Sequence, residues 1–252
     1  MIEPLIAVVS HSKPDVVAVS GDLTQRARTG EFKKARAFLE ALPTPQIVVP
    51  GNHDVPFFNP YARFVQRLER YREYITSDLE PFFADPEIAV LGINTARSST
   101  VKGGRINAGQ VARIRERFSS LAPAVTRFVV THHPFDLPEG YSERALVGRA
   151  RMAMEKLEGS GADVFLAGHL HVIHRGEASL RYQEKCPAAL VIQAGTATST
   201  RGRGEVNSFN IIRVDGGQLG LERLNWRPER QTFAVAATES FRRTAQGWKE
   251  IL

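Results

Sequence analysis

Four short apolar runs in this chain each end in side chains that can bind a divalent metal ion. The junctions are Gly21-Asp22, Gly51-Asn52-His53-Asp54, Thr131-His132-His133-Pro134 and Gly168-His169-Leu170-His171. Carboxylate, amide and imidazole ligands without sulfur favour manganese, iron, cobalt or zinc over calcium or a structural zinc finger. Because sites in open α/β sheets form at the carboxyl ends of strands, we expect the four junctions to meet at one site.

The elements that must position these side chains are strands that alternate with helices. Apolar runs predict strands at 15–20, 46–49, 87–94, 124–131 and 163–167. Apolar residues at helical spacing predict the helices between and around them. These predicted helices cover 2–12, 30–42, 61–75, 108–121 and 143–159.

The spacing of apolar residues changes after the last histidine junction. Short β runs replace the helical periodicity, beginning with 188–194, and Asp215-Gly216-Gly217 is typical of a hairpin turn. No repeat, low-complexity tract or linker divides the chain. We therefore expect one domain over 1–252, with a βαβ part (1–171) that carries the metal motifs and a mostly antiparallel part (172–252).

Composition excludes some classes of protein and leaves others open. The chain has 252 residues, a net charge of +6 and a pI of about 9.7, which suits an anionic substrate. Without a Lys/Arg block, a basic surface kept for solubility explains the charge as well as nucleic-acid binding does. Cys186 is the only cysteine, so no intrachain disulfide or thiolate cluster can form. With no signal peptide or membrane-length apolar stretch, we expect a cytoplasmic protein without a membrane partner.

In order, spacing and type, the four junctions resemble those of the calcineurin-like metallophosphoesterase superfamily. Within it, Gly21-Asp22-Leu23-Thr24-Gln25 and the segment 195–200 are similar to the bacterial branch of cyclic-nucleotide and glycerophosphodiester phosphodiesterases. The resemblance covers roughly residues 15–210. It implies an α/β fold, a four-layer α/β/β/α sandwich of two mixed sheets flanked by helices. It also implies a dinuclear centre of Mn, Fe, Zn or Co, and hydrolysis of a small anionic phosphodiester by metal-activated hydroxide.

The resemblance assigns metal ligands residue by residue. Asp22 would bridge two metal ions. Asn52, His132 and His169 would complete one metal site, and His171 would belong to the other. Two such ions polarise phosphoryl oxygens and activate water near neutral pH, which agrees with the assigned activity.

Other side chains have roles in catalysis or substrate binding under the same resemblance. His53 would protonate the leaving alkoxide, and Asp54 would orient its ring, since a carboxylate beside an imidazole fixes the tautomer. His133 competes with the preceding histidine for the ligand role; the family pattern places it in the pocket wall. Arg97 and Arg201 could hold a phosphate oxygen, although loop arginines are more often solvated.

One family motif is absent from this sequence. The family opens with a strand that ends in Asp-x-His and supplies two ligands to the second metal, but no Asp-x-His occurs here. Only three residues separate His11 from the first predicted strand, too few for a parallel crossover, so we place His11 on a helix. We therefore expect the first strand to be missing from this chain. Either the protein starts upstream with Asp-x-His, or the second metal site keeps only Asp22 and His171. The strand at 16–20 would then have an open edge, which could pair in a homo-oligomer.

Two other functions remain open at this stage. A metal-poor pseudoenzyme of the same fold, binding a phosphorylated ligand or a partner protein, agrees with the missing Asp-x-His. The presence of His53 and of every other ligand opposes it, because those residues would have no common purpose. A nuclease agrees with the basic pI, but no extra domain or basic arm supports nucleic acid as a partner.

Overall fold

The computed structural model describes residues 1–56, 68–97, 103–182, 186–199 and 205–251. The predicted helix at 61–75 lies partly outside these residues, and Arg201 lies wholly outside them. Among the described helices, none combines the length and the apolar character that crossing a membrane would require.

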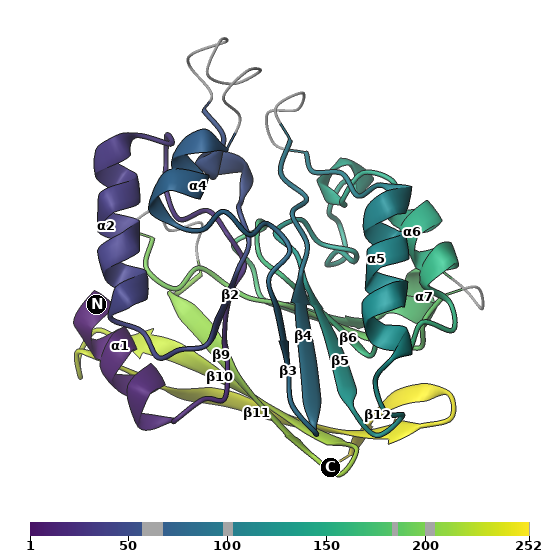
Figure 1. The fold of residues 1–252 in the computed structure, drawn as a ribbon. Coiled ribbons are helices and arrows are strands. Elements are labelled where there is room, and N and C mark those ends of the chain that lie inside the picture. The colour runs from purple at the N-terminus through teal and green to yellow at the C-terminus, as the bar shows by residue number, and fades with distance from the viewer. Residues whose placement is uncertain (57–67, 98–102, 183–185, 200–204, 252) are drawn as a thin grey trace.

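Four layers of secondary structure stack on one another, with helices outside and strands inside (Figure 1). Three hydrophobic clusters fill the spaces between the layers. This arrangement confirms the predicted α/β/β/α sandwich. The first two layers contain α1 (Ile2–His11), α2 (Thr29–Glu40), α4 (Glu69–Tyr74), β1 (Val17–Val19), β2 (Gln46–Val48), β9 (Ser208–Asp215), β10 (Gln218–Arg227), β11 (Thr232–Thr244) and β12 (Gly247–Ile251).

The second sheet layer has six strands in the order β3-β4-β5-β6-β8-β7. Its four central strands run parallel, while β3 and β7 are antiparallel edges. The parallel direction brings the carboxyl ends of β5 and β6 side by side, and the histidine junctions follow these two strands. The elements of this layer and of the helices outside it are β3 (Phe82–Ala84), β4 (Ile88–Gly92), β5 (Thr126–Val130), β6 (Val164–Ala167), β7 (His174–Glu177), β8 (Leu190–Gln193), α5 (Ala108–Ser119), α6 (Ala150–Leu157) and α7 (Ala178–Tyr182).

The first sheet layer is built in two pieces. One piece is the parallel pair β1-β2, and the other is the antiparallel meander β12-β11-β10-β9. Both pieces bury one face in the cluster beneath α1 and α2, through Val17 of β1 and Phe209 of β9 for example. Both bury the opposite face against the six-stranded sheet, where Ile47 and Ile212 lie. Within the described residues β1 pairs only with β2, and Ala18 is exposed, in agreement with the predicted open edge.

Helix α5 shows how local sequence and packing agree. Asn107 accepts a hydrogen bond from the Gln110 backbone N–H, and the Gln110 side chain accepts one from Asn107 N–H, so the first turn is capped in both directions. Val111, Ile114 and Phe118 recur at helical spacing and are buried against the six-stranded sheet. The predicted boundaries of this helix are therefore accurate to within two residues.

The predicted helix at 143–159 is wrong in its first half. The chain forms a single 3-10 turn, η2 (Glu143–Ala145), and the α-helix begins only at Ala150. In between, Gly148 makes a β-bridge to Arg105, and Arg149 adopts a left-handed backbone conformation with φ of 68°. This contact with a distant loop overrides the helical periodicity of the segment.

The change from helical to β spacing of apolar residues after residue 171 does not mark a boundary between the two sheets. β7 and β8 both follow that point, yet both belong to the six-stranded sheet, and β8 runs parallel to β6. The antiparallel meander begins only at β9, with the predicted turn at Asp215-Gly216-Gly217 between β9 and β10. The sequence analysis also missed β3, β12 and the short helix α7.

Candidate metal centre

Two glycine turns touch one another at the carboxyl ends of β1 and β2. A Cβ on Gly51 would lie 2.1 Å from Asp22 Oδ1, and a Cβ on Gly21 would lie 2.6 Å from the Gly51 nitrogen. Gly21 also has a φ of 93°, which other residues rarely adopt. The approach of Asp22 to the Asn52 turn therefore requires glycine at both positions.

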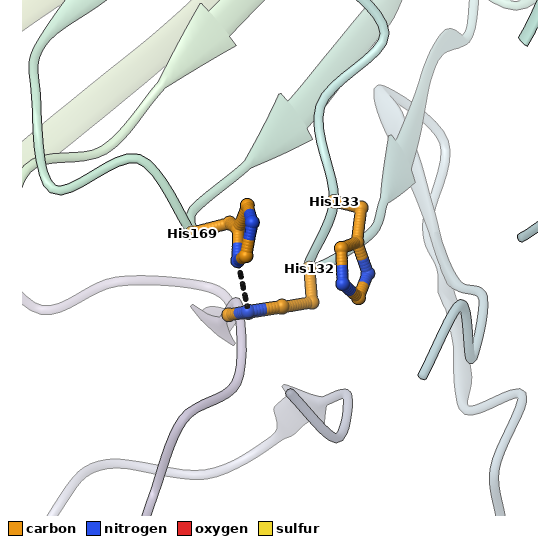
Figure 2. Close-up of side chains that lie close together, drawn as sticks. All are labelled: His132, His133 and His169. Atoms are coloured by element: carbon orange, nitrogen blue, oxygen red, sulfur yellow. Dashed lines mark hydrogen bonds between the residues drawn. The ribbon is translucent and has the colours of Figure 1, made fainter. Parts of the chain in front are cut away.

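Four candidate ligand atoms converge beside these turns. Asn52 Oδ1 lies 3.1 Å from His132 Nε2 and 2.9 Å from His169 Nδ1. A dashed line in Figure 2 joins the two imidazole nitrogens, which are 3.2 Å apart. Asp22 Oδ1 is 3.4 Å from His132 Nε2. Ligands held at about 2.1 Å from one ion in tetrahedral or octahedral geometry are about 3.0–3.4 Å apart. These spacings fit the predicted set of four ligands around one metal ion.

The buried His132 ring is held by a backbone carbonyl. Its Nδ1 lies 2.7 Å from the oxygen of Ser20, which can only accept, so Nδ1 carries the proton. The lone pair of Nε2 then faces Asn52 and His169. A hydrogen bond to the other ring nitrogen of this kind is the usual support of a metal-binding histidine.

His169 lies on a strained turn and is held in its neutral form. Its φ is 72°, and Asp22 and His171 also have positive φ values, of 57° and 59°. Such strain in non-glycine residues persists where the surroundings enforce it, and it clusters at functional sites. Burial, and then the neighbouring His132, lower the pKa of His169 to about 3, so its imidazole is neutral at physiological pH, as a ligand must be.

His171 and His53 flank this group of four. Both contribute to lowering the pKa of His169, so both lie close to it. The Nδ1 of His171 is 2.5 Å from the hydroxyl of Thr196, which lies in the segment 195–200. The backbone N–H of His53 donates to Asp22 Oδ1 at 3.0 Å, so its turn is joined directly to the candidate bridging carboxylate.

The expectation that Asp54 orients the His53 ring is wrong. The His53 Nδ1 lies 2.9 Å from the carbonyl oxygen of Gln25, which holds the ring instead. The buried Asp54 carboxylate accepts hydrogen bonds from Leu23 N–H, from Thr24 N–H and hydroxyl, and from Gly51 N–H. Burial, and then the charge of Asp22, raise the pKa of Asp54 to about 6, so it is mostly ionised at neutral pH. Asp54 therefore ties the two glycine turns together.

His133 lies beside the four candidate ligand atoms and forms a histidine cluster with His132 and His169, whose ligand nitrogens lie within 4.8 Å of one another. It is fully buried, and its Nδ1 is 2.9 Å from the hydroxyl of Thr95. Its ring centre lies 4.8 Å from that of His132 and 4.7 Å from that of His169 (Figure 2). A Cβ on Gly104 would meet its ring, so the loop at Gly104 closes over it from the other side. This position fits the predicted place in the wall of the site.

The predicted arginine contacts have less support in the structure. The half-buried Arg97 donates from Nε to the carbonyl oxygen of Arg105 at 3.4 Å, so this side chain packs against its own loop. A substrate contact by Arg97 stays a prediction, and one by Arg201 lies outside the described residues.

The sequence analysis missed the groups that hold the histidine rings. The carbonyl oxygens of Ser20 and Gln25 and the Thr196 hydroxyl orient His132, His53 and His171. Every residue type has a backbone carbonyl, so the sequence gives no sign of the Ser20 and Gln25 contacts. The Thr196 contact did have a sequence signal, because Thr196 lies in the segment 195–200 that resembles the phosphodiesterase branch.

Comparison with known proteins agrees with this geometry. The family model of the calcineurin-like phosphoesterases matches residues 2–173. Glycerophosphodiester phosphodiesterase GpdQ of Enterobacter lignolyticus is 31% identical over 136 residues, covering 53% of this chain and 46% of that relative. The chain thus spans about half the length of this relative.

One solved structure shares the fold at low identity. The crystal structure of a dimetal phosphatase from Danio rerio has a TM-score of 0.60 at 14% identity, covering 93% of this chain and 88% of that one. A Vps29 structure from Entamoeba histolytica has a TM-score of 0.48 at 12% identity, covering 95% and 89%.

The layered fold, with candidate metal ligands at its strand ends, is that of a metallophosphoesterase. With the family model matched over most of its length, this chain belongs to the calcineurin-like phosphoesterase family.

The contact between the two glycine turns yields a test. We expect Gly51→Ala to displace Asp22, because the new methyl group would overlap its carboxylate, and to weaken metal binding at least about tenfold. Gly30→Ala is the matched control, since a Cβ there meets nothing within 4 Å. Metal titration by calorimetry and thermal unfolding would be measured for both. Equal metal affinity in the two folded variants would contradict the requirement for glycine at position 51.

Proposed function

We propose that this protein is a metal-dependent phosphodiesterase that hydrolyses a small anionic phosphodiester of the cyclic-nucleotide or glycerophosphodiester type. The observation that carries the proposal is the convergence of Asp22, Asn52, His132 and His169 at 2.9–3.4 Å, with His53 on the adjoining turn. The similarity to a glycerophosphodiester phosphodiesterase over half the chain supports the substrate class. We keep the cytoplasm as the expected compartment.

The donor set suits a first-row divalent ion. One carboxylate, one amide oxygen and two neutral imidazoles favour Mn, Fe, Co or Zn over calcium, as the sequence already indicated. When bound, such an ion supplies Lewis-acid chemistry: it polarises a phosphoryl oxygen and lowers the pKa of water. Asp22, with its second carboxylate oxygen, and His171 are the residues that would hold a second ion.

We assign His53 the role of proton donor. With Nδ1–H donating to the Gln25 carbonyl, the imidazolium form of the ring would present a second proton, on Nε2, to a leaving alkoxide. The backbone N–H of His53 donates to Asp22 Oδ1, which joins its turn to the ligand cluster. Asp54 keeps this turn in place through its bonds to the neighbouring turn.

A catalytically impaired relative that binds phosphorylated ligands or proteins is the second candidate. It is favoured by the second metal site, for which the sequence offers only Asp22 and His171. The two candidates differ in catalytic turnover, so the hydrolysis assays described next separate them.

The first prediction concerns hydrolysis itself. The protein reconstituted with manganese should hydrolyse bis(p-nitrophenyl) phosphate, and EDTA should stop the reaction. Asn52→Ala and His169→Ala should each lower kcat/KM at least about 100-fold, because each removes one ligand of the cluster. His11→Ala, on α1, is the control and should retain full activity. Activity that survives EDTA and both ligand substitutions would overturn the metal assignment.

The second prediction separates leaving-group chemistry from metal binding. His53→Ala should keep its metal content yet lose about 10²–10⁴ in rate on an alkyl phosphodiester, whose alkoxide needs a proton. The loss on bis(p-nitrophenyl) phosphate should be much smaller, since p-nitrophenolate departs unprotonated. Equal losses on both substrates, measured as kcat at saturating manganese, would assign His53 a different role.

The third prediction concerns the number of metal ions. Four ligands converge on one site while the other keeps two, so the chain as given should bind one manganese ion tightly and a second weakly or not at all. Equilibrium dialysis followed by elemental analysis gives the stoichiometry. Two tightly held ions per chain would mean that other residues replace the missing Asp-x-His.

A further inference from the structure

A cavity of about 670 Å³ lies at the amino end of α6, apart from the four converging ligand atoms. The loop at Gly103 and Gly104, the segment that leads into α6, and α7 form its walls. None of the candidate metal ligands lines it. Gly104 forms part of the cavity wall and also packs against the His133 ring, so one loop separates the cavity from the wall of the metal centre.

The charge in this cavity is unbalanced. Its two acidic groups, Asp136 and Glu143, both pair with one arginine, Arg181, at 2.5 and 3.0 Å. Asp136 also bonds His174 at 2.8 Å; burial opposes its ionisation, but these hydrogen bonds outweigh burial and lower its pKa. Asp136 therefore stays ionised, and both acids are already paired with Arg181.

Three further arginines line the same cavity. The side chains of Arg144, Arg149 and Arg151 form no ion pair or hydrogen bond with any residue that the structure describes. All three are exposed, so a cavity wall with three arginines that no described acid pairs offers an anion several accessible positive charges.

The backbone adds donors at the same place. Helix α6 has eight residues and no side-chain cap, and its N-cap, Arg149, is held at a φ of 68°. Within the described part of the chain, the N–H group of Arg151, which lines the cavity, has no acceptor. Free N–H groups at a helix amino end favour negative charge, in addition to the guanidinium groups.

One side of the cavity is apolar. Leu146, Ala150 and Tyr182 line it, and so does Leu180, whose side chain is 81% exposed. An inorganic ion alone would leave this side in water. A ligand with an apolar body attached to its anionic group would cover it and gain from the burial.

We propose that this cavity is a second anion-binding site, which takes the phosphoryl group of a small organic phosphate. Arg149, Arg151 and the first N–H groups of α6 hold the phosphoryl oxygens, and Leu146 and Leu180 contact the organic part. A phosphoryl dianion matches several guanidinium groups better than a carboxylate does, because it offers three acceptor oxygens. Binding here needs no metal ion, so this proposal stands or falls independently of the phosphodiesterase proposal.

The test is calorimetric titration of the EDTA-treated protein with phenyl phosphate, which carries both chemical parts. One equivalent should bind. Arg151→Gln and Arg149→Asn should each weaken binding at least about tenfold; asparagine is chosen because it tolerates the left-handed backbone at position 149. Arg230→Gln, in the β10–β11 turn, is the matched charge control, and Asn52→Ala reports on the metal centre; both should bind normally.

A second comparison identifies the organic part of the ligand. Leu180→Ser should weaken phenyl phosphate at least about threefold and leave inorganic phosphate unchanged. Equal affinity for the two probes would overturn the apolar subsite. No binding at millimolar phenyl phosphate, binding lost in Asn52→Ala, or binding unchanged in both arginine variants would overturn the site as a whole. Circular dichroism of each variant checks that it is folded, and the two arginine variants provide independent tests.

Discussion

The candidate metal centre depends on the contact between two chain turns that have no side chain at the point where they meet. Gly21 and Gly51 allow the ends of β1 and β2 to approach until the Asp22 carboxylate lies against the Asn52 turn. The buried Asp54 carboxylate spans both turns with four hydrogen bonds and holds them at that distance. The remaining ligands arrive from the other sheet, on the turns after β5 and β6. The site is thus the place where the two sheets of the sandwich meet at their carboxyl ends.

Much of this could be predicted, because local sequence and global fold agree in most of the chain. Metal-capable side chains at four predicted strand ends led us to expect one site, and the family resemblance named Asp22, Asn52, His132 and His169 as ligands. The structure brings the Asn52, His132 and His169 ligand atoms within 3.2 Å of one another and Asp22 Oδ1 to 3.4 Å from His132 Nε2. Helices with a clean apolar face, such as α5, were predicted to within two residues.

The failures have a common physical cause, which is contact between distant segments. The helix predicted at 143–159 breaks where Gly148 bridges to Arg105. Strand β3 was missed because it has only three residues, too few for a clear pattern, and it forms by pairing with β4. The predicted orientation of the His53 ring by Asp54 failed because a backbone carbonyl holds the ring, and any residue type supplies one.

The hydrogen bonds that join the centre connect residues very far apart along the chain. His132 meets Ser20 across 112 positions, and His169 meets Asn52 across 117. Contacts of such high sequence separation form late, since the intervening chain must first lose its entropy. A metal ion therefore cannot nucleate folding here as it does in a zinc finger, where neighbouring ligands close a short loop. During synthesis, the chain must emerge beyond His169 before the four ligands can hold an ion together. We therefore expect metal loading to follow folding of the protein and not to guide it.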